Sequence, residues 1–300
     1  MRIYTRSRMK SRLVWHNGEL VTFESATVSA LAHGLQRGSG VFDVGSFATD
    51  AEGRLALFRV RDHLQRFERS HVGAGLVLRW DEETLVQATR EVVKKSGFSR
   101  GLIRWSGAVS SMQRDVVPAD PETDVTIFVD ESRPRAQSYR VAVYDDMIKA
   151  PGSVFPPTLK VGAAYFGPML ARRRALSEGF DEVVLRDADG FLAEAPTANV
   201  FFVRNGELYT PPLGSILPGI TRTSVMALAE SLSVRVHERP LSGNEPLEEA
   251  FLTATSYPLM PISEIVGMRR TAPGPLTQQL QALFACAEVG KIFRNWIDYV

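Results

Sequence analysis

The stretch that decides the fold is DEVVLRDADGFLAEAPTANVFFVRNGELYT, residues 181–210. Asp189-Gly190 and Asn205-Gly206 lie between short apolar runs, and such dipeptides favour the two-residue turns of β-hairpins. The runs on either side, DEVVLRD, FLAEA, NVFFV and ELYTP, have the length of strands. The pattern therefore predicts successive hairpin-connected strands in the C-terminal half of the chain.

The flanking sequence continues this mixed pattern. Upstream, YRVAVYD (139–145) and TLKVGAAYF (158–166) are predicted strands, and FGPMLARRRALSEG is a predicted helix that ends at Gly179. Downstream, LPGITRTSVMALAESL is a predicted helix with Leu228 and Leu232 on one face. Two further strands, VRVHERP and EAFLTATS, and a C-terminal helix complete this half.

The N-terminal half has the pattern of a mixed α+β structure. Asn17-Gly18 indicates a hairpin, VFDVGSFAT and GRLALFRV are predicted strands, and Asp81 is the predicted N-cap of a helix that ends near Gly97. The polar segment ESRPRAQ, which contains Pro134, is typical of an interdomain linker. The predicted organisation is an N-terminal domain at 1–130, a linker at 131–138 and a C-terminal domain at 139–300.

Composition excludes several classes of partner. The chain has 300 residues, 23% of them charged, and a formal net charge of +1. Since no long basic or acidic block is present, neither a nucleic acid nor a membrane surface is an expected partner. No apolar run reaches the length of about 18 residues needed to span a bilayer.

The single cysteine and the N-terminal arm carry no predicted chemistry. Cys286 lies in an apolar helical pattern, which predicts a packed core thiol, and no Cys/His cluster suggests a metal site. We expect a reducing, cytoplasmic location. The start of the chain is predicted to be a solvated basic arm, with Arg2, Arg6, Arg8, Lys10 and Arg12.

Two residues suggest chemistry when they are considered together. Lys160 lies in the apolar run PPTLKVGAAYF, where it either extends to the surface or is desolvated, and a desolvated amine is a nucleophile for Schiff-base chemistry. Glu194 lies on a predicted strand between Ala193 and Ala195. Its carboxylate is either exposed or holds a pyridine nitrogen in its protonated form.

Other segments favour anion binding. LPGITR places Gly219 and Thr221 at the start of a helix, where backbone N–H groups and the helix dipole attract phosphate; a plain Pro-Gly turn is the alternative. Further residues are either phosphate donors or ordinary structural polar residues: Arg66, Thr253, Thr255 and Ser256.

In their order along the chain, these residues resemble the fold-type IV pyridoxal-phosphate family, which includes branched-chain and D-amino-acid aminotransferases, (R)-amine transaminases and aminodeoxychorismate lyases. The resemblance runs from VWHNGELV to FLTATS, and its most specific blocks are HGLQRGSGVFD (33–43), FRVRDHLQRF (58–67), LKVGAAYF (159–166), GFDEVVLRDADGFLAEAPTANVFFV (179–203) and LPGITR (217–222). It implies a two-domain fold of α+β / α/β class, with a smaller N-terminal α+β domain and a larger C-terminal pseudo-barrel domain.

The resemblance also implies pyridoxal 5'-phosphate as the cofactor. Lys160 is then the catalytic residue, which binds the cofactor as a Schiff base and shuttles protons. Tyr165 lies next to the phenolic oxygen, and Glu194, supported by Asn199, pairs with the pyridine nitrogen. The implied phosphate ligands are Arg66, Gly219, Ile220, Thr221 and Thr255.

The substrate residues depart from the branched-chain pattern. Arg37 and Leu102 occupy positions where typical branched-chain enzymes have tyrosines, and Ser46 replaces an arginine, although Arg104 keeps one. Guanidinium groups suit a substrate carboxylate, so Arg37 and Arg104 are candidates, with Arg114 a weaker one. The expected substrate residues are Arg37, Phe42, Ser46, Arg104, Ser256 and Tyr257.

The predicted function is transfer of an amino group between an amino acid and a 2-oxo acid such as 2-oxoglutarate, with ping-pong kinetics. Branched-chain L-amino acids are the leading donors, because LKVGAAYF and the Glu194 block look most like that branch. D-amino-acid or (R)-amine transamination is the first alternative, and aminodeoxychorismate lyase is a further one. Outside catalysis the rival is a binding protein that has lost activity. A homodimer is expected from the resemblance.

Overall fold

A computed structural model describes residues 13–132 and 136–300, so the predicted basic arm and Pro134 lie outside the described residues. The chain divides into two compact units, each of which is described by itself. The first contains the described residues up to Ser132, together with Lys160–Ala163 and Glu288–Val300. The second contains the described residues between those segments. This division differs from the predicted domains in placing the C-terminal residues with the first unit, because β16 (Ile297–Tyr299) pairs with β4 (Leu55–Phe58).

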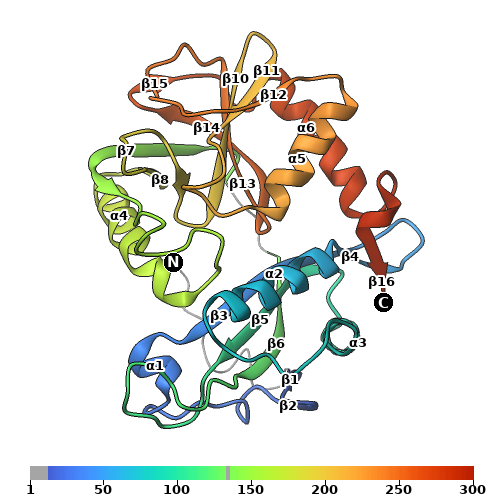
Figure 1. Cartoon of the computed structure of the whole chain (residues 1–300). Helices are drawn as coiled ribbons and strands as arrows, with labels where there is room; N and C mark the ends of the chain where they lie inside the picture. Colours follow the sequence, from blue (N-terminus) through green and yellow to red (C-terminus); the bar gives the residue numbers. More distant parts are fainter. Residues whose placement is uncertain (1–12, 133–135) are drawn as a thin grey trace. The chain divides into compact units, whose positions relative to one another are not determined.

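The first unit is built on an antiparallel sheet with the strand order β16-β4-β3-β5-β6-β1-β2 (Figure 1). At its centre β3 (Gly40–Thr49) and β5 (Arg100–Ala108) pair along their whole length. Helices α2 and α3 cover one face, on which Asp43 and Trp105 are buried. The remaining elements of this unit are β1 (Leu13–His16), β2 (Glu19–Thr22), α1 (His33–Arg37), α2 (Val60–Gly73), α3 (Glu82–Ser96), β6 (Asp124–Glu131) and a 3-10 turn (Arg294–Trp296).

Local sequence signals in this unit are confirmed. Asn17 and Gly18 both have positive φ and connect β1 to β2 in a two-residue hairpin. Asp81 accepts the N–H of Thr84 at 2.8 Å and caps α3, which ends at Gly97 in the left-handed conformation. Each signal acts within four residues of chain, which is why sequence alone could predict it.

The second unit contains a mixed sheet with the strand order β12-β11-β10-β13-β14-β7-β8, while β9 pairs with β10 and β15 pairs with β14. β7 is parallel to both β8 and β14, and β11 is parallel to β12. The bounds are β7 (Tyr139–Ile148), β8 (Glu182–Arg186), β9 (Glu194–Ala195), β10 (Ala198–Arg204), β11 (Glu207–Thr210), β12 (Val236–Glu238), β13 (Glu249–Ala254), β14 (Tyr257–Ile265) and β15 (Met268–Arg269).

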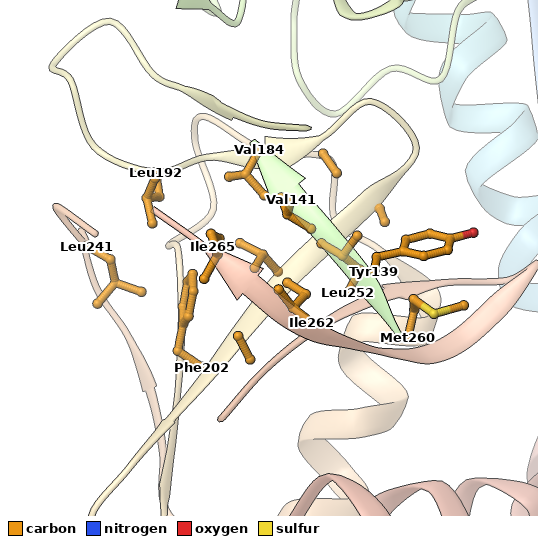
Figure 2. Close-up of a cluster of buried hydrophobic side chains, with 14 of the residues drawn as sticks. Tyr139, Val141, Val184, Leu192, Phe202, Leu241, Leu252, Met260, Ile262 and Ile265 are labelled. Carbon is orange, nitrogen blue, oxygen red and sulfur yellow. The ribbon is translucent and has the colours of Figure 1, made fainter. Parts of the chain in front are cut away.

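The core of the second unit gathers side chains from most of these strands (Figure 2). Val200, Leu252 and Ile262 are fully buried in it. Because burial of each such side chain stabilises the fold by about 1.5–3 kcal/mol, the strands that carry the polar site residues are rigidly held. The helices of this unit are α4 (Phe166–Ser177), α5 (Ile220–Ser231) and α6 (Pro275–Glu288).

The decisive stretch folds largely as its turns predict. Asn205 and Gly206 form the hairpin between β10 and β11. Asp189-Gly190 also forms a turn, in which the N–H of Gly190 donates to the carbonyl of Asp187. The predicted strand FLAEA is reduced to Glu194–Ala195 and an isolated bridge between Leu192 and Arg186.

Two predictions in this half are wrong. TLKVGAAYF is not a strand: Val161 makes one bridge to Val41, and Gly162–Tyr165 form a 3-10 helix. The strand was predicted from the apolar character of the run, although its glycine and alanine residues have low strand propensity. Cys286 has intermediate exposure and is not a packed core thiol.

Among the described residues, no helix combines the length and apolar character needed to cross a membrane. Nor do the described residues contain a cluster of histidine, cysteine and acidic side chains suited to a metal ion.

Candidate active site

The backbone of Lys160 is held in place within the first unit. Its carbonyl accepts the N–H of Phe42 at 3.1 Å, and its own N–H donates to Ser70 Oγ at 3.1 Å. Ser70 in turn donates to the carbonyl of Arg66 at 2.8 Å. The peptide of Lys160 is therefore tied to β3 on one side and to α2 on the other.

The side chain of Lys160 lies over an aromatic ring. Its Nζ is 4.8 Å from the ring centroid of Phe42, within the range of a cation–π contact. Arg104 shares this ring, with its Cζ 5.5 Å from the same centroid and 5.9 Å from that of Phe128. Phe42 thus links the amine predicted to bind the cofactor to a guanidinium predicted to bind a carboxylate.

Arg66 belongs to a buried ion pair that the sequence did not suggest. Its Nε and Nη2 donate to the two carboxylate oxygens of Asp43, each at 2.8 Å, and His63 Nδ1 contacts the same carboxylate at 2.8 Å. Burial alone would raise the pKa of Asp43, but the charge and hydrogen bonds of Arg66, and then of His63, hold that pKa well below its usual range. Burial lowers the pKa of His63 despite its bond to Asp43. The Arg66 guanidinium is therefore fixed in one orientation.

The substrate candidates of the central strands share one face of the first sheet. Side chains alternate along a strand, so Phe42 and Ser46 lie on the face opposite the buried Asp43. Ser46 stands directly across from Leu102 on β5, and Arg104 follows two residues later on the same face. The two departures from the branched-chain pattern on these strands are therefore one cross-strand pair.

Arg37 and Arg114 lie together away from these strands. Arg37 is the exposed last residue of α1, and its Nη2 donates to the carbonyl of Arg114 at 3.5 Å. The two arginines thus belong to one surface region of the first unit.

In the second unit, Glu194 is a nearly buried carboxylate on which several donors converge. Its Oε2 accepts Asn199 Nδ2 at 2.9 Å and the N–H of Leu217 at 3.1 Å. Its Oε1 accepts the ammonium of Lys149. Because both oxygens accept hydrogen bonds from these donors, the geometry favours the ionised carboxylate, which the predicted role at a pyridine nitrogen requires.

Lys149 is a further residue, besides Asp43 and His63, that the sequence did not point to. It directly follows β7 and precedes an Ala-Pro-Gly segment, and 45 residues separate it from Glu194. No local pattern connects two such positions, so only the fold reveals the pair.

Asn199 organises the surroundings of Glu194. It stands opposite Glu194 on β9 and opposite Thr253 on β13, so the three polar residues form a row across adjacent strands. A Cβ added to Gly219 would lie 2.0 Å from Asn199 Oδ1. Gly219 is therefore required for the close approach of its loop to Asn199.

The start of α5 falls where the sequence predicted it. Gly219 is the N-cap without a side-chain cap, and Ile220 and Thr221 form the first turn, with Thr221 buried. Backbone N–H groups at such a helix start, with the helix dipole behind them, attract phosphate.

The other predicted residues of the second unit occupy different environments. Thr255 and Ser256 form the half-buried turn between β13 and β14. Tyr165 is half-buried just before α4. Tyr257 is instead part of the core: its hydroxyl is 3.2 Å from Thr197 Oγ1, and burial raises its pKa to about 12. The role of Tyr257 as a substrate contact stays a prediction.

The family described as amino-transferase class IV matches residues 40–265, and the chain belongs to this family. The branched-chain-amino-acid aminotransferase of Escherichia coli is 30% identical over 300 residues, with 96% of each chain covered. The corresponding enzyme of Pseudomonas aeruginosa is 28% identical over 292 residues, covering 93% of this chain and 94% of its own.

Solved structures give the same result. A branched-chain aminotransferase from Thermoproteus uzoniensis, crystallised with norvaline, has a TM-score of 0.92 and 31% identity, covering 96% of this chain and 99% of its own. A branched-chain aminotransferase from Thermobaculum terrenum in its PLP form has a TM-score of 0.90 and 29% identity, with 97% and 99% coverage. The predicted fold class and family are confirmed.

Each unit, taken by itself, carries polar groups that suit a part of pyridoxal phosphate. The second unit offers an ionised carboxylate for a ring nitrogen, a helix start for a phosphate, and the buried Thr253 Oγ1, which has no hydrogen-bond partner among the described residues. The first unit offers the Lys160 amine, which suits an aldehyde, and the fixed guanidinium of Arg66, which suits a phosphate. Within each unit, these groups fit the corresponding part of the cofactor in charge and in chemistry.

We predict that Asp43→Asn lowers the free energy of unfolding at neutral pH by about 3 kcal/mol, because it leaves the buried Arg66 without its ionised partner. The pKa of Asp43 is lower in the folded protein than in the unfolded chain. The wild type is therefore more stable than the variant by the full amount above the unfolded pKa of about 3.9, and this difference in the free energy of unfolding disappears as the pH falls. Urea unfolding over a pH series measures both effects. Asp62→Asn on the partly exposed face of α2 is the matched control, with an expected loss under about 1 kcal/mol. Equal free energies of unfolding for Asp43→Asn and the wild type at neutral pH would contradict a stabilising role of the buried Asp43–Arg66 ion pair.

Proposed function

We propose that this chain is a pyridoxal-phosphate-dependent aminotransferase that moves amino groups between branched-chain L-amino acids and a 2-oxo acid such as 2-oxoglutarate. Membership of the class IV aminotransferases supports the reaction class, and the names of the relatives support the substrate class. The single observation that carries the proposal is the Glu194 carboxylate, oriented by Asn199 and the N–H of Leu217.

The residues have the following proposed roles. When bound, the cofactor supplies an electron-withdrawing ring that stabilises negative charge at the substrate α-carbon. Glu194 holds the proton on the ring nitrogen, and Tyr165 donates to the phenolic oxygen. The proposed phosphate ligands are Arg66, Gly219, Ile220, Thr221 and Thr255.

Lys160 is the proposed catalytic residue. Its Nζ would hold the cofactor through the aldehyde, and as a free amine it would take the proton from the substrate α-carbon as a general base. Its fixed peptide supports this role, because a base must return the proton with a defined geometry. Arg104, beside the Phe42 ring, is the proposed carboxylate ligand, and Arg37, Ser46 and Ser256 are the other proposed substrate contacts.

The pair of Ser46 and Leu102 favours a second candidate. Since a typical branched-chain enzyme has an arginine and a tyrosine at these positions, their replacement on one patch of sheet favours a changed donor. D-amino-acid or (R)-amine transamination is therefore the alternative.

A homodimer is proposed as the assembly. Helix α4 supports it, because Phe166, Met169, Leu170 and Leu176 are exposed at 66%, 53%, 43% and 55%. Exposed apolar groups at this spacing are typical of a surface that pairs with another chain. The cytoplasmic location stays a prediction from the sequence.

We predict that Lys160→Ala abolishes both turnover and the visible absorbance of the lysine-bound cofactor, because the variant lacks the amine that binds it. Lys95→Ala, an exposed lysine on α3, is the control and should leave both unchanged. Absorbance spectra of the purified proteins, with a coupled assay, measure the result. A Lys160→Ala variant that keeps the band and the activity would remove the proposal.

The donor is tested by a half-reaction screen that follows loss of the visible band. L-leucine should react fastest, and 2-oxoglutarate should restore the band. D-alanine and (R)-1-phenylethylamine represent the alternative, and rapid reaction with either of them but not with L-leucine would defeat the branched-chain proposal. Release of pyruvate from aminodeoxychorismate without an amino acceptor would instead indicate a lyase.

A further inference from the structure

We propose that Lys149 is a positioning residue that acts through Glu194 and sets how readily the bound cofactor is protonated. The inference rests on the proposed role of Glu194 at the ring nitrogen. It adds a residue that neither the motifs nor the proposed cofactor contacts include.

The donors to Glu194 differ in the length of the side chains that carry them. Asn199 and the N–H of Leu217 hold Oε2, and Asn199 Nδ2 is further fixed by the carbonyl of Leu217 at 3.0 Å. Oε1 receives the ammonium of Lys149, which lies at the end of a flexible four-carbon stem. Asn199 and the N–H of Leu217 thus fix the direction of the carboxylate, while the ammonium at the end of the lysine stem binds the other oxygen.

Backbone hydrogen bonds hold the two segments that carry this ion pair. The N–H of Lys149 donates to the carbonyl of Arg186 at 2.8 Å, and the N–H of Ala193 donates to the carbonyl of Leu185 at 2.8 Å. Both partners are therefore anchored to the C-terminal end of β8. Their side chains are only 16% and 12% exposed, so solvent screens the pair weakly.

The charge of Lys149 has a direct consequence. A protonated ring nitrogen at Glu194 is a second cation beside the same carboxylate, and like charges oppose each other in a weakly screened site. Lys149 therefore keeps Glu194 ionised but limits protonation of the cofactor. The neighbouring charges at this end of β8, Arg186 and Asp145, neutralise each other at 2.8 Å.

The test is a spectrophotometric pH titration of the cofactor bound to the purified holoenzyme. Lys149→Gln keeps a donor for Oε1 but removes the charge, so the midpoint of the visible-band titration should rise by about one pH unit. Lys149→Arg keeps the charge, so its titration midpoint should equal that of the wild type. Lys149→Met, which removes both charge and donor, should shift the midpoint in the same direction, and provides the measurement if the glutamine variant does not fold.

The outcomes separate the two proposals. If the neutral variants titrate with the wild type and lose only thermal stability, Lys149 merely neutralises a buried acid and the inference is overturned. If the wild-type protein shows no titrating visible band, the proposed function fails instead. A raised midpoint in both neutral variants, with none in Lys149→Arg, supports the inference.

Discussion

The structure depends on keeping two carboxylates ionised in places with little water. Asp43 in the first unit is fully buried; Arg66 neutralises its charge, and His63 adds a hydrogen bond. Glu194 in the second unit is held by Asn199, Leu217 and Lys149. A buried charge persists only with such partners, because the desolvation penalty is several kcal/mol per ion. The proposed reaction needs both carboxylates: Asp43 fixes Arg66 in one unit, and Glu194 is itself the proposed partner of the ring nitrogen in the other.

Sequence predicted what short stretches of chain determine. The Asn17-Gly18 and Asn205-Gly206 hairpins, the Asp81 cap and the start of α5 after Gly219 each rest on the conformational preference of a few residues, and all four occur. The strand predicted around Lys160 failed because an apolar run does not distinguish a strand from a segment that makes one bridge and then turns.

Contacts between distant residues of the candidate site could not be predicted. Asp43 is 23 residues from Arg66, and Lys149 is 45 residues from Glu194, so no periodicity connects either pair. The resemblance to a family supplied the roles of Lys160 and Glu194 and the support of Glu194 by Asn199, but it was silent on Ser70 and Lys149, which contact them. The substrate residues give a second example. Ser46 and Leu102 are far apart in the sequence, and only the pairing of β3 with β5 shows that these two differences from the branched-chain pattern lie side by side on one face of the sheet.

The central claim is that Lys160 carries the cofactor, and the most direct measurement is chemical. Reduction of the holoenzyme with borohydride fixes the cofactor to the amine that holds it, and peptide mapping by mass spectrometry then identifies that residue. The account predicts a phosphopyridoxyl group on Lys160 alone. A label on Lys149 or on any other lysine, or a protein that binds the cofactor without forming a reducible bond, would contradict it.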